Sequence, residues 1–139
     1  MKNKTCLTLA DVKIIAAGCE KEALRQNLAV AIAIVDDGGH LIWLQRLDGA
    51  PLTSMQIATS KAHTSALGRR PTKAYSDRIS SGEVAVLSMP GGLTFLEGGE
   101  PIAVDGECVG AVGVSGVKPA EDAQIARAGI SLFIDSLKR

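Results

Sequence analysis

A twenty-residue segment at positions 30–49 constrains the fold more than any other part of the chain. Its sequence, VAIAIVDDGGHLIWLQRLDG, places apolar runs on both sides of an Asp-Asp-Gly-Gly turn. Asp-Gly and Gly-Gly pairs between such runs favour two-residue hairpin turns, because glycine adopts positive φ without steric cost. The segment therefore predicts two antiparallel strands, at residues 30–35 and 41–47.

Helical periodicity marks further parts of the chain. We predict a first helix that begins at the N-cap Thr8, carries Asp11 in its first turn and ends near Gln26. A second helix is predicted over residues 54–67 with Ser54 as N-cap candidate, and a short one over 73–80. The last helix opens at residues 118–119, because proline is tolerated in a first turn.

Short β signals occupy the segment between the helices. They lie at residues 93–96, 101–104 and 107–114, and Asp105-Gly106 supplies a second tight turn. The order of elements, with hairpin connections, predicts an α+β fold in which helices cover one antiparallel sheet. The length indicates a single domain, residues 1–139.

The charge balance excludes several classes of partner. Lys and Arg together number 15, as do Asp and Glu, so the formal net charge is zero. With only 3% aromatic residues as well, broad contacts with nucleic acid or anionic membrane are not expected. No apolar run has the length of a membrane span or follows the pattern of a secretory signal, so we expect a cytoplasmic protein. Zero net charge favours a homo-oligomer.

Cysteine and serine patterns offer little chemistry. Cys6, Cys19 and Cys108 show no C-x-x-C spacing, which argues against a zinc knuckle or a redox pair of that type. No serine lies in a G-x-S-x-G element, and the glycines at 110, 113 and 116 do not open a helix. We therefore identify no catalytic residue.

Two histidines are candidate haem or metal ligands. His40 follows the hairpin turn, and His63 lies on the second predicted helix beside its apolar stripe. Neither belongs to an H-x-x-x-H or E-x-x-H pair, so a surface or packing role is the alternative for each.

Polar residues and glycines at element ends form a candidate ligand pocket. If they gather at one end of the sheet, their cations and backbone N–H groups could hold a carboxylate. The alternative is that Arg46 pairs with Asp48 or a neighbouring helix while the glycines only turn the chain. The candidate set is Arg46, Asp48, Ser54, Lys61, Gly98, Gly99, Ser115 and Gly116.

Seven blocks along nearly the whole chain carry a family resemblance through their order and spacing. They are LTLADV at 7–12, AIVDDGGHL at 33–41, RLDGAPLTSMQIATSKAHT at 46–64, GRRP at 68–71, GGEPI at 98–102, VGAVGVSG at 109–116 and EDAQIARAG at 121–129. In this arrangement the chain resembles the GlcG / HbpS / PduO C-terminal domain family. His40 and all eight pocket candidates fall on positions of the family pattern, whereas relatives often carry Tyr at the place of His63.

The resemblance implies a profilin-like, three-layer α/β/α domain with a five-stranded antiparallel sheet that assembles into homo-oligomers. Relatives are described as haem-binding or haem-degrading, as accessory proteins of glycolate utilisation, and as the C-terminal part of adenosyltransferase-like proteins of diol utilisation. The adenosyltransferase activity belongs to a separate N-terminal domain, so it does not carry over to this chain.

Three functional hypotheses follow. The leading one is a ligand-binding accessory protein that takes haem or a small organic metabolite without covalent chemistry. The second is an enzyme that degrades haem or acts on a small hydroxy acid or aldehyde, with Arg46 and Lys61 holding a carboxylate. The third is a structural oligomer that scaffolds the enzymes of a metabolic pathway.

Overall fold

The computed structural model describes all residues, 1–139, and contains four α-helices, one short 3-10 helix and four strands. In chain order they are α1 (Leu9–Arg25), β1 (Ala31–Asp36), β2 (Leu41–Arg46), α2 (Ser54–Gly68), α3 (Lys73–Ser80), the 3-10 helix η1 (Val84–Ser88), β3 (Gly99–Val104), β4 (Glu107–Ser115) and α4 (Pro119–Leu137).

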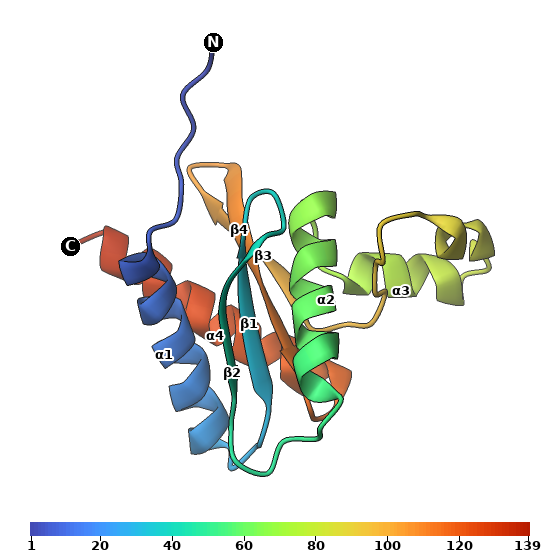
Figure 1. Ribbon diagram of the computed structural model, residues 1–139, viewed down its shortest axis with the longest axis horizontal. Helices are drawn as coiled ribbons and strands as arrows, with labels where there is room; N and C mark the ends of the chain where they lie inside the picture. Colours follow the sequence, from blue (N-terminus) through green and yellow to red (C-terminus); the bar gives the residue numbers. More distant parts are fainter.

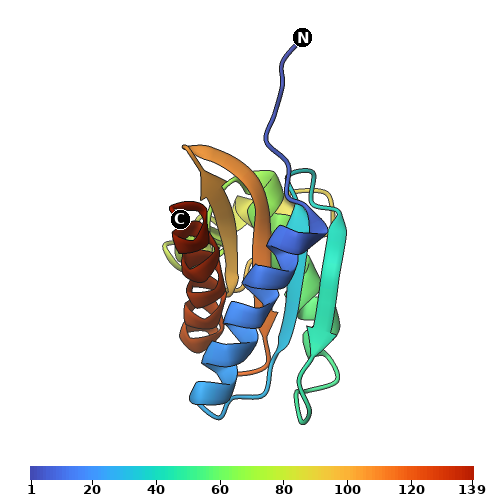
Figure 2. The ribbon, with the colours of Figure 1, turned by 90° about the vertical axis from the view of Figure 1, so that its left-hand side faces the viewer.

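The strands form one antiparallel sheet in the order β2-β1-β4-β3. The predicted hairpin is confirmed, with Ala31 opposite Arg46 at its open end. Helix α2 covers one face of the sheet, and α1 and α4 lie side by side on the other (Figures 1 and 2). The layers are therefore helix, sheet and helix pair.

The expectation of a five-stranded sheet is wrong, because residues 93–96 form no strand. This segment lies against α2, where hydroxyl groups take its hydrogen bonds. Thr94 N donates to Thr64 Oγ1 over 2.8 Å, and Ser60 Oγ donates to Gly92 O over 3.1 Å. Phe95 packs on Tyr75, with ring centroids 5.2 Å apart. The hydrogen bonds and the ring contact hold the segment against α2 and α3 instead of against a neighbouring strand.

The predicted helix starts are correct in position but not in every cap. Thr8 caps α1 in a reciprocal capping box with Asp11, as expected. Pro119 occupies the first turn of α4, also as expected. The N-cap of α2 is Thr53 rather than Ser54, whose hydroxyl donates instead to the carbonyl of Pro51 in the preceding loop.

Alternate side chains of β1 face two different cores. Ile32 and Ile34 point toward α1 and α4 and join the larger apolar cluster, which includes Ile15, Ile102 and Ile125. The side chains that point the other way meet α2 and are mostly alanines: Ala31, Ala33 and Ala111 from the sheet, and Ala58, Ala62 and Ala66 from the helix. Because methyl groups are short, α2 lies unusually close to the sheet.

Gly113 is the point of closest approach between α2 and β4. A Cβ atom there would lie 2.5 Å from the backbone nitrogen of Ala62 and closer still to the carbonyl oxygen of Ala58. Both atoms belong to the helix backbone and cannot rotate away. Only glycine fits at this position.

Residues 69–98, which we call the arm, leave the body of the fold after α2 and return at β3. Helix α3 and η1 project beyond α2 on the side away from α1 (Figure 1). The arm returns at Gly98 and Gly99, which pack against the backbone and side chain of Lys61 on α2.

The close contact predicts a large effect of Gly113→Ala. The added methyl group must push α2 off the sheet, so we expect a loss of about 3 kcal/mol of unfolding free energy, at the upper end for overpacking. Urea denaturation followed by circular dichroism measures it. Gly38→Ala is the control, because its Cβ would meet mainly the exposed His40 side chain. It should change stability by less than about 0.5 kcal/mol. Equal urea midpoints for the two variants would contradict the prediction.

Candidate functional site

A shallow groove of about 460 Å³ runs between α2 and the edge strand β2, and we call it the α2–β2 groove. Its apolar wall comes from two strand residues and the first turn of the helix. The lining residues are Leu41, Leu44, Met55, Gln56, Thr59 and Ser60. The groove has the volume of a small-molecule site and mixed apolar and polar walls.

His63 lies one helical turn beyond Thr59, where α2 meets the β1–β2 turn. Its Nδ1 is 3.0 Å from the carbonyl oxygen of Gly39. Since a carbonyl can only accept, Nδ1 carries the proton, and the tautomer compatible with this contact has its lone pair on Nε2. Gly39, with φ of 80°, permits this contact, because a Cβ there would lie 2.7 Å from Nδ1. The turn thus holds the ring in one tautomer.

His40 lies on the same turn but is differently placed. Its side chain is 83% exposed, and Nδ1 is 3.3 Å from the carboxylate of Asp36. The same carboxylate accepts the backbone N–H groups of Gly38 and His40. No group of three or more His, Cys, Asp or Glu side chains is arranged to hold a metal ion.

Lys61 and Asp122 form a buried ion pair that joins α2 to α4. Lys61 Nζ donates to Asp122 Oδ2 over 3.1 Å and to the carbonyl oxygen of Val114 over 2.9 Å. Asp122 Oδ1 accepts the backbone N–H of Val117 over 3.2 Å. The two side chains are only 3% and 2% exposed. Both charged groups are therefore satisfied within the protein.

Burial shifts both members of the pair toward their neutral forms. It lowers the pKa of the Lys61 ammonium, an effect that the nearby Asp122 carboxylate opposes. It raises the pKa of Asp122 to about 6, against the opposing charge of Lys61. Desolvation thus outweighs the mutual attraction at each site.

The structure brings four of the predicted pocket residues together around this pair. Gly98 and Gly99 cover Lys61, since a Cβ on Gly98 would lie 2.6 Å from Nζ. Gly99 N also donates to Thr72 Oγ1 over 2.9 Å. Ser115 follows the carbonyl that Lys61 binds and is buried.

The other four candidates lie elsewhere. Arg46, the last residue of β2, and Asp48, two positions beyond it, are exposed, and the structure shows no ion pair between them. Asp48 lines a pocket of about 260 Å³ beside the end of α1. Ser54 and Gly116 both lie near Pro51. A carboxylate site built from all eight residues stays a prediction.

The sequence did not identify Asp122 as the partner of Lys61, because its position in the first turn of a helix already explains an acidic residue there. An acidic residue in the first turn of a helix suits the helix dipole, and nothing local shows that it is buried. The role of Gly39 at His63 was missed for a similar reason, since 24 positions separate the two residues.

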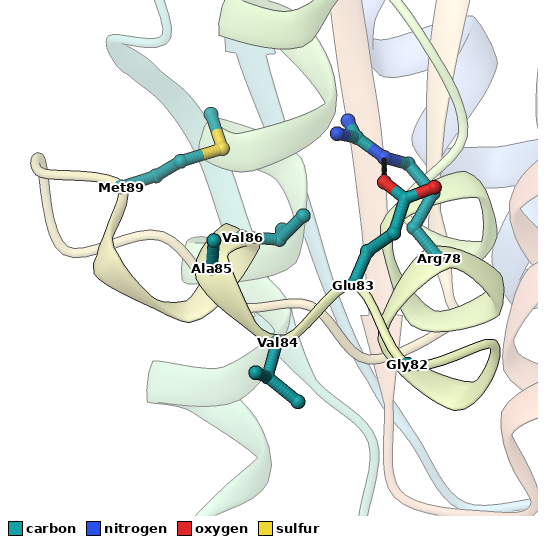
Figure 3. A pocket seen from close by; sticks show the side chains of 7 residues that line it. All are labelled: Arg78, Gly82, Glu83, Val84, Ala85, Val86 and Met89. Atoms are coloured by element: carbon teal, nitrogen blue, oxygen red, sulfur yellow. Dashed lines mark hydrogen bonds and ion pairs between the residues drawn. The ribbon is translucent and has the colours of Figure 1, made fainter.

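The arm carries its own pocket of about 460 Å³, lined by residues of α3 and η1 (Figure 3). An ion pair between Arg78 and Glu83, 2.8 Å long, closes one side. Val84, Leu87 and Met89 are exposed. The predicted homo-oligomer stays a prediction, and these side chains are apolar surface available for it. None of the helices is long and apolar enough to cross a membrane.

Comparisons with known proteins agree with the resemblance seen in the sequence. The family model described as "Haem degrading protein HbpS-like" matches residues 7–131. Protein GlcG of Escherichia coli K12 is 45% identical over 115 residues, which cover 83% of this chain and 85% of GlcG.

Two solved structures share the fold over most of its length. A double mutant of HbpS from Streptomyces reticuli superposes with a TM-score of 0.87 at 31% identity, covering 95% of this chain and 90% of that one. A PduOC:heme complex superposes with a TM-score of 0.82 at 26% identity, covering 92% and 95%. These matches confirm the predicted relationship to GlcG, HbpS and PduO.

The buried pair predicts that Asp122→Asn is strongly destabilising. The change leaves the Lys61 ammonium buried without its carboxylate, so we expect a loss of about 3–5 kcal/mol in urea unfolding at pH 7. The double variant Lys61→Met with Asp122→Leu should recover most of this loss, because it removes both charges together. A single variant as stable as the wild type would show that the pair carries no such role.

Proposed function

Because this chain belongs to the HbpS-like family, we propose that it binds haem, with the His63 imidazole as iron ligand beside the α2–β2 groove. The observation that carries the proposal is the hydrogen bond from His63 Nδ1 to Gly39 O. It leaves Nε2 as the nitrogen with the lone pair. In many metal-binding histidines the ring nitrogen that does not bind the metal donates a hydrogen bond to a carbonyl or carboxylate, which orients the ring.

The groove beside His63 suits a flat apolar ligand. Leu41, Leu44 and Met55 offer an aliphatic wall on which a porphyrin face could pack, and Met55 adapts to irregular surfaces. The open side of the groove leaves room for a ligand larger than its own volume. The chain has no C-x-x-C-H sequence for covalent attachment of haem, so binding is non-covalent.

The haem complex of PduOC, which shares this fold at 26% identity, supports the class of ligand. The choice of His63 rests on the geometry in this chain alone. His40 is the less suitable candidate because its ring is mostly exposed and lies against the Asp36 carboxylate.

Titration with haemin tests the proposal. For the wild type we expect a shifted Soret band that saturates, and for His63→Ala a loss of that band and affinity weaker by at least about tenfold, as for other disrupted metal sites. His40→Ala is the matched control and should bind like the wild type. Unchanged affinity and spectrum in His63→Ala would exclude His63 as the ligand. Leu44→Asp in the groove, compared with Leu9→Asp on α1, tests the apolar wall separately.

Haem degradation is the second candidate function, and the description of the matching family model favours it. If this chain degrades haem, the loaded protein should lose its Soret band in air with ascorbate and release iron to ferrozine. We expect both changes to be faster than with free haemin or with His63→Ala. A Soret band that persists, with no iron released, would leave binding as the function.

A further inference from the structure

A further pocket, of about 430 Å³, is lined by the N-terminal segment and both hairpin turns. The N-terminal segment passes these turns at one end of the molecule (Figures 1 and 2). It is lined by residues of that segment, of both turns and of the end of α2, among them Lys4, Thr5, Asp37, Arg69 and Cys108. It shares no residue with the α2–β2 groove. The pocket combines the cations Lys4 and Arg69, the carboxylates Asp37 and Glu107, and the half-buried thiol of Cys108.

The Arg69 guanidinium is fixed beside this thiol. Arg69 ends α2 in the left-handed conformation, with φ of 55°. Its Nη1 donates to the carbonyl oxygens of Ala66, over 2.9 Å, and Asp37, and lies 3.9 Å from Cys108 Sγ. The Cys108 thiol itself donates to the carbonyl oxygen of Gly110 over 3.3 Å. Arg69 is placed to pair with the thiolate, the reactive form of cysteine, when the thiol loses its proton.

A second thiol lies on the segment that borders the same pocket. Cys6 is exposed and directly follows Thr5, which lines the pocket. Lys4 anchors the segment through a 2.9 Å ion pair with Asp37, and Leu7 packs on Gly110 of β4. Cys6 lies between these anchors and next to Leu7, which contacts the strand that carries Cys108.

The N-terminal segment carries no regular structure before or between these two anchors. Residues 1–7 belong to no helix or strand and make no backbone–backbone hydrogen bond. A shift of Cys6 toward Cys108 therefore breaks no regular structure. Cys19, by contrast, is fully buried between α1 and α4, and burial raises its pKa to about 12. Of the three cysteines, it is the one that should stay inert.

We propose that Cys108 and Cys6 form a peroxide-reactive dithiol site. The Cys108 thiolate attacks one peroxide oxygen, the O–O bond breaks, and the departing hydroxide takes a proton to leave as water. The Cys6 thiolate then attacks Sγ of the Cys108 sulfenic acid, forming the S–S bond and releasing a second water. Two thiols are oxidised and one peroxide is reduced to two waters.

Peptide mass spectrometry of the full-length protein tests the disulfide. After treatment with hydrogen peroxide, the wild type should yield a Cys6–Cys108 cross-linked peptide and keep Cys19 reduced. Cys6→Ser should instead accumulate a dimedone adduct on Cys108. Absence of the cross-linked peptide, or cross-links only between separate chains, would overturn the proposal.

The role of Arg69 is tested by the rate of iodoacetamide alkylation at Cys108. Arg69→Gly removes the guanidinium and keeps the left-handed backbone, which glycine adopts freely. We expect Cys108 to react roughly threefold to tenfold more slowly, with Cys6 unchanged. Arg70→Gln, which removes a neighbouring charge with no contact to Cys108, is the control. An unchanged Cys108 rate in Arg69→Gly would also overturn the proposal. None of these measurements depends on haem, so their outcome is separate from that of the haemin titration.

Discussion

The fold depends on the close contact between α2 and the sheet, which only very small side chains permit. Alanines on both surfaces, with Gly113 at the closest point, bring backbone to backbone. Such a contact tolerates little sliding or rotation, because the next larger side chain collides with main-chain atoms. Helix α2 is therefore fixed, and the polar residues on its flanks are delivered to defined places: Lys61 to the end of β4 and His63 to the β1–β2 turn.

The buried ion pair is a consequence of this placement. Once α2 lies against the sheet, Lys61 has no route to solvent and must find partners inside, which Asp122 and Val114 provide. The pair also ties the base of the arm to the body, since Gly98 and Gly99 pack on Lys61. Buried pairs of this kind contribute little net stability but are costly to break. A structural role accounts for Lys61 without any ligand.

The two proposed sites both border α2 but differ in the chemistry of their residues. The α2–β2 groove has apolar and polar walls, and the candidate ligand atom beside it is His63 Nε2, since Nδ1 donates to Gly39 O. The pocket beside Cys108 is lined mainly by polar and charged residues, and its proposed reactivity depends on the Arg69 cation at the end of α2. Both sites border α2, one along its side facing β2 and the other at its C-terminal end.

Local patterns predicted most of the secondary structure. Three features depend only on residues close together in the chain and were therefore predictable from local sequence. They are the hairpin at residues 30–49, the Thr8 cap and the start of α4. The segment 93–96 was mistaken for a strand because its β signal is local, whereas hydroxyls of α2, some 30 positions away, decide its hydrogen bonds. A still larger separation, 61 positions, hid Asp122 as the partner of Lys61.

The sequence by itself determined the α+β class, the order of elements, the family and the list of residues with chemical potential. Only the tertiary structure decided which of these residues contact one another. Lys61 pairs with Asp122, His63 Nδ1 contacts Gly39 O, and Cys108 lies beside Arg69. The physical reason is that turn and helix preferences act over a few residues. Burial, tautomer and thiol environment instead depend on contacts between elements, which exist only after the layers have packed.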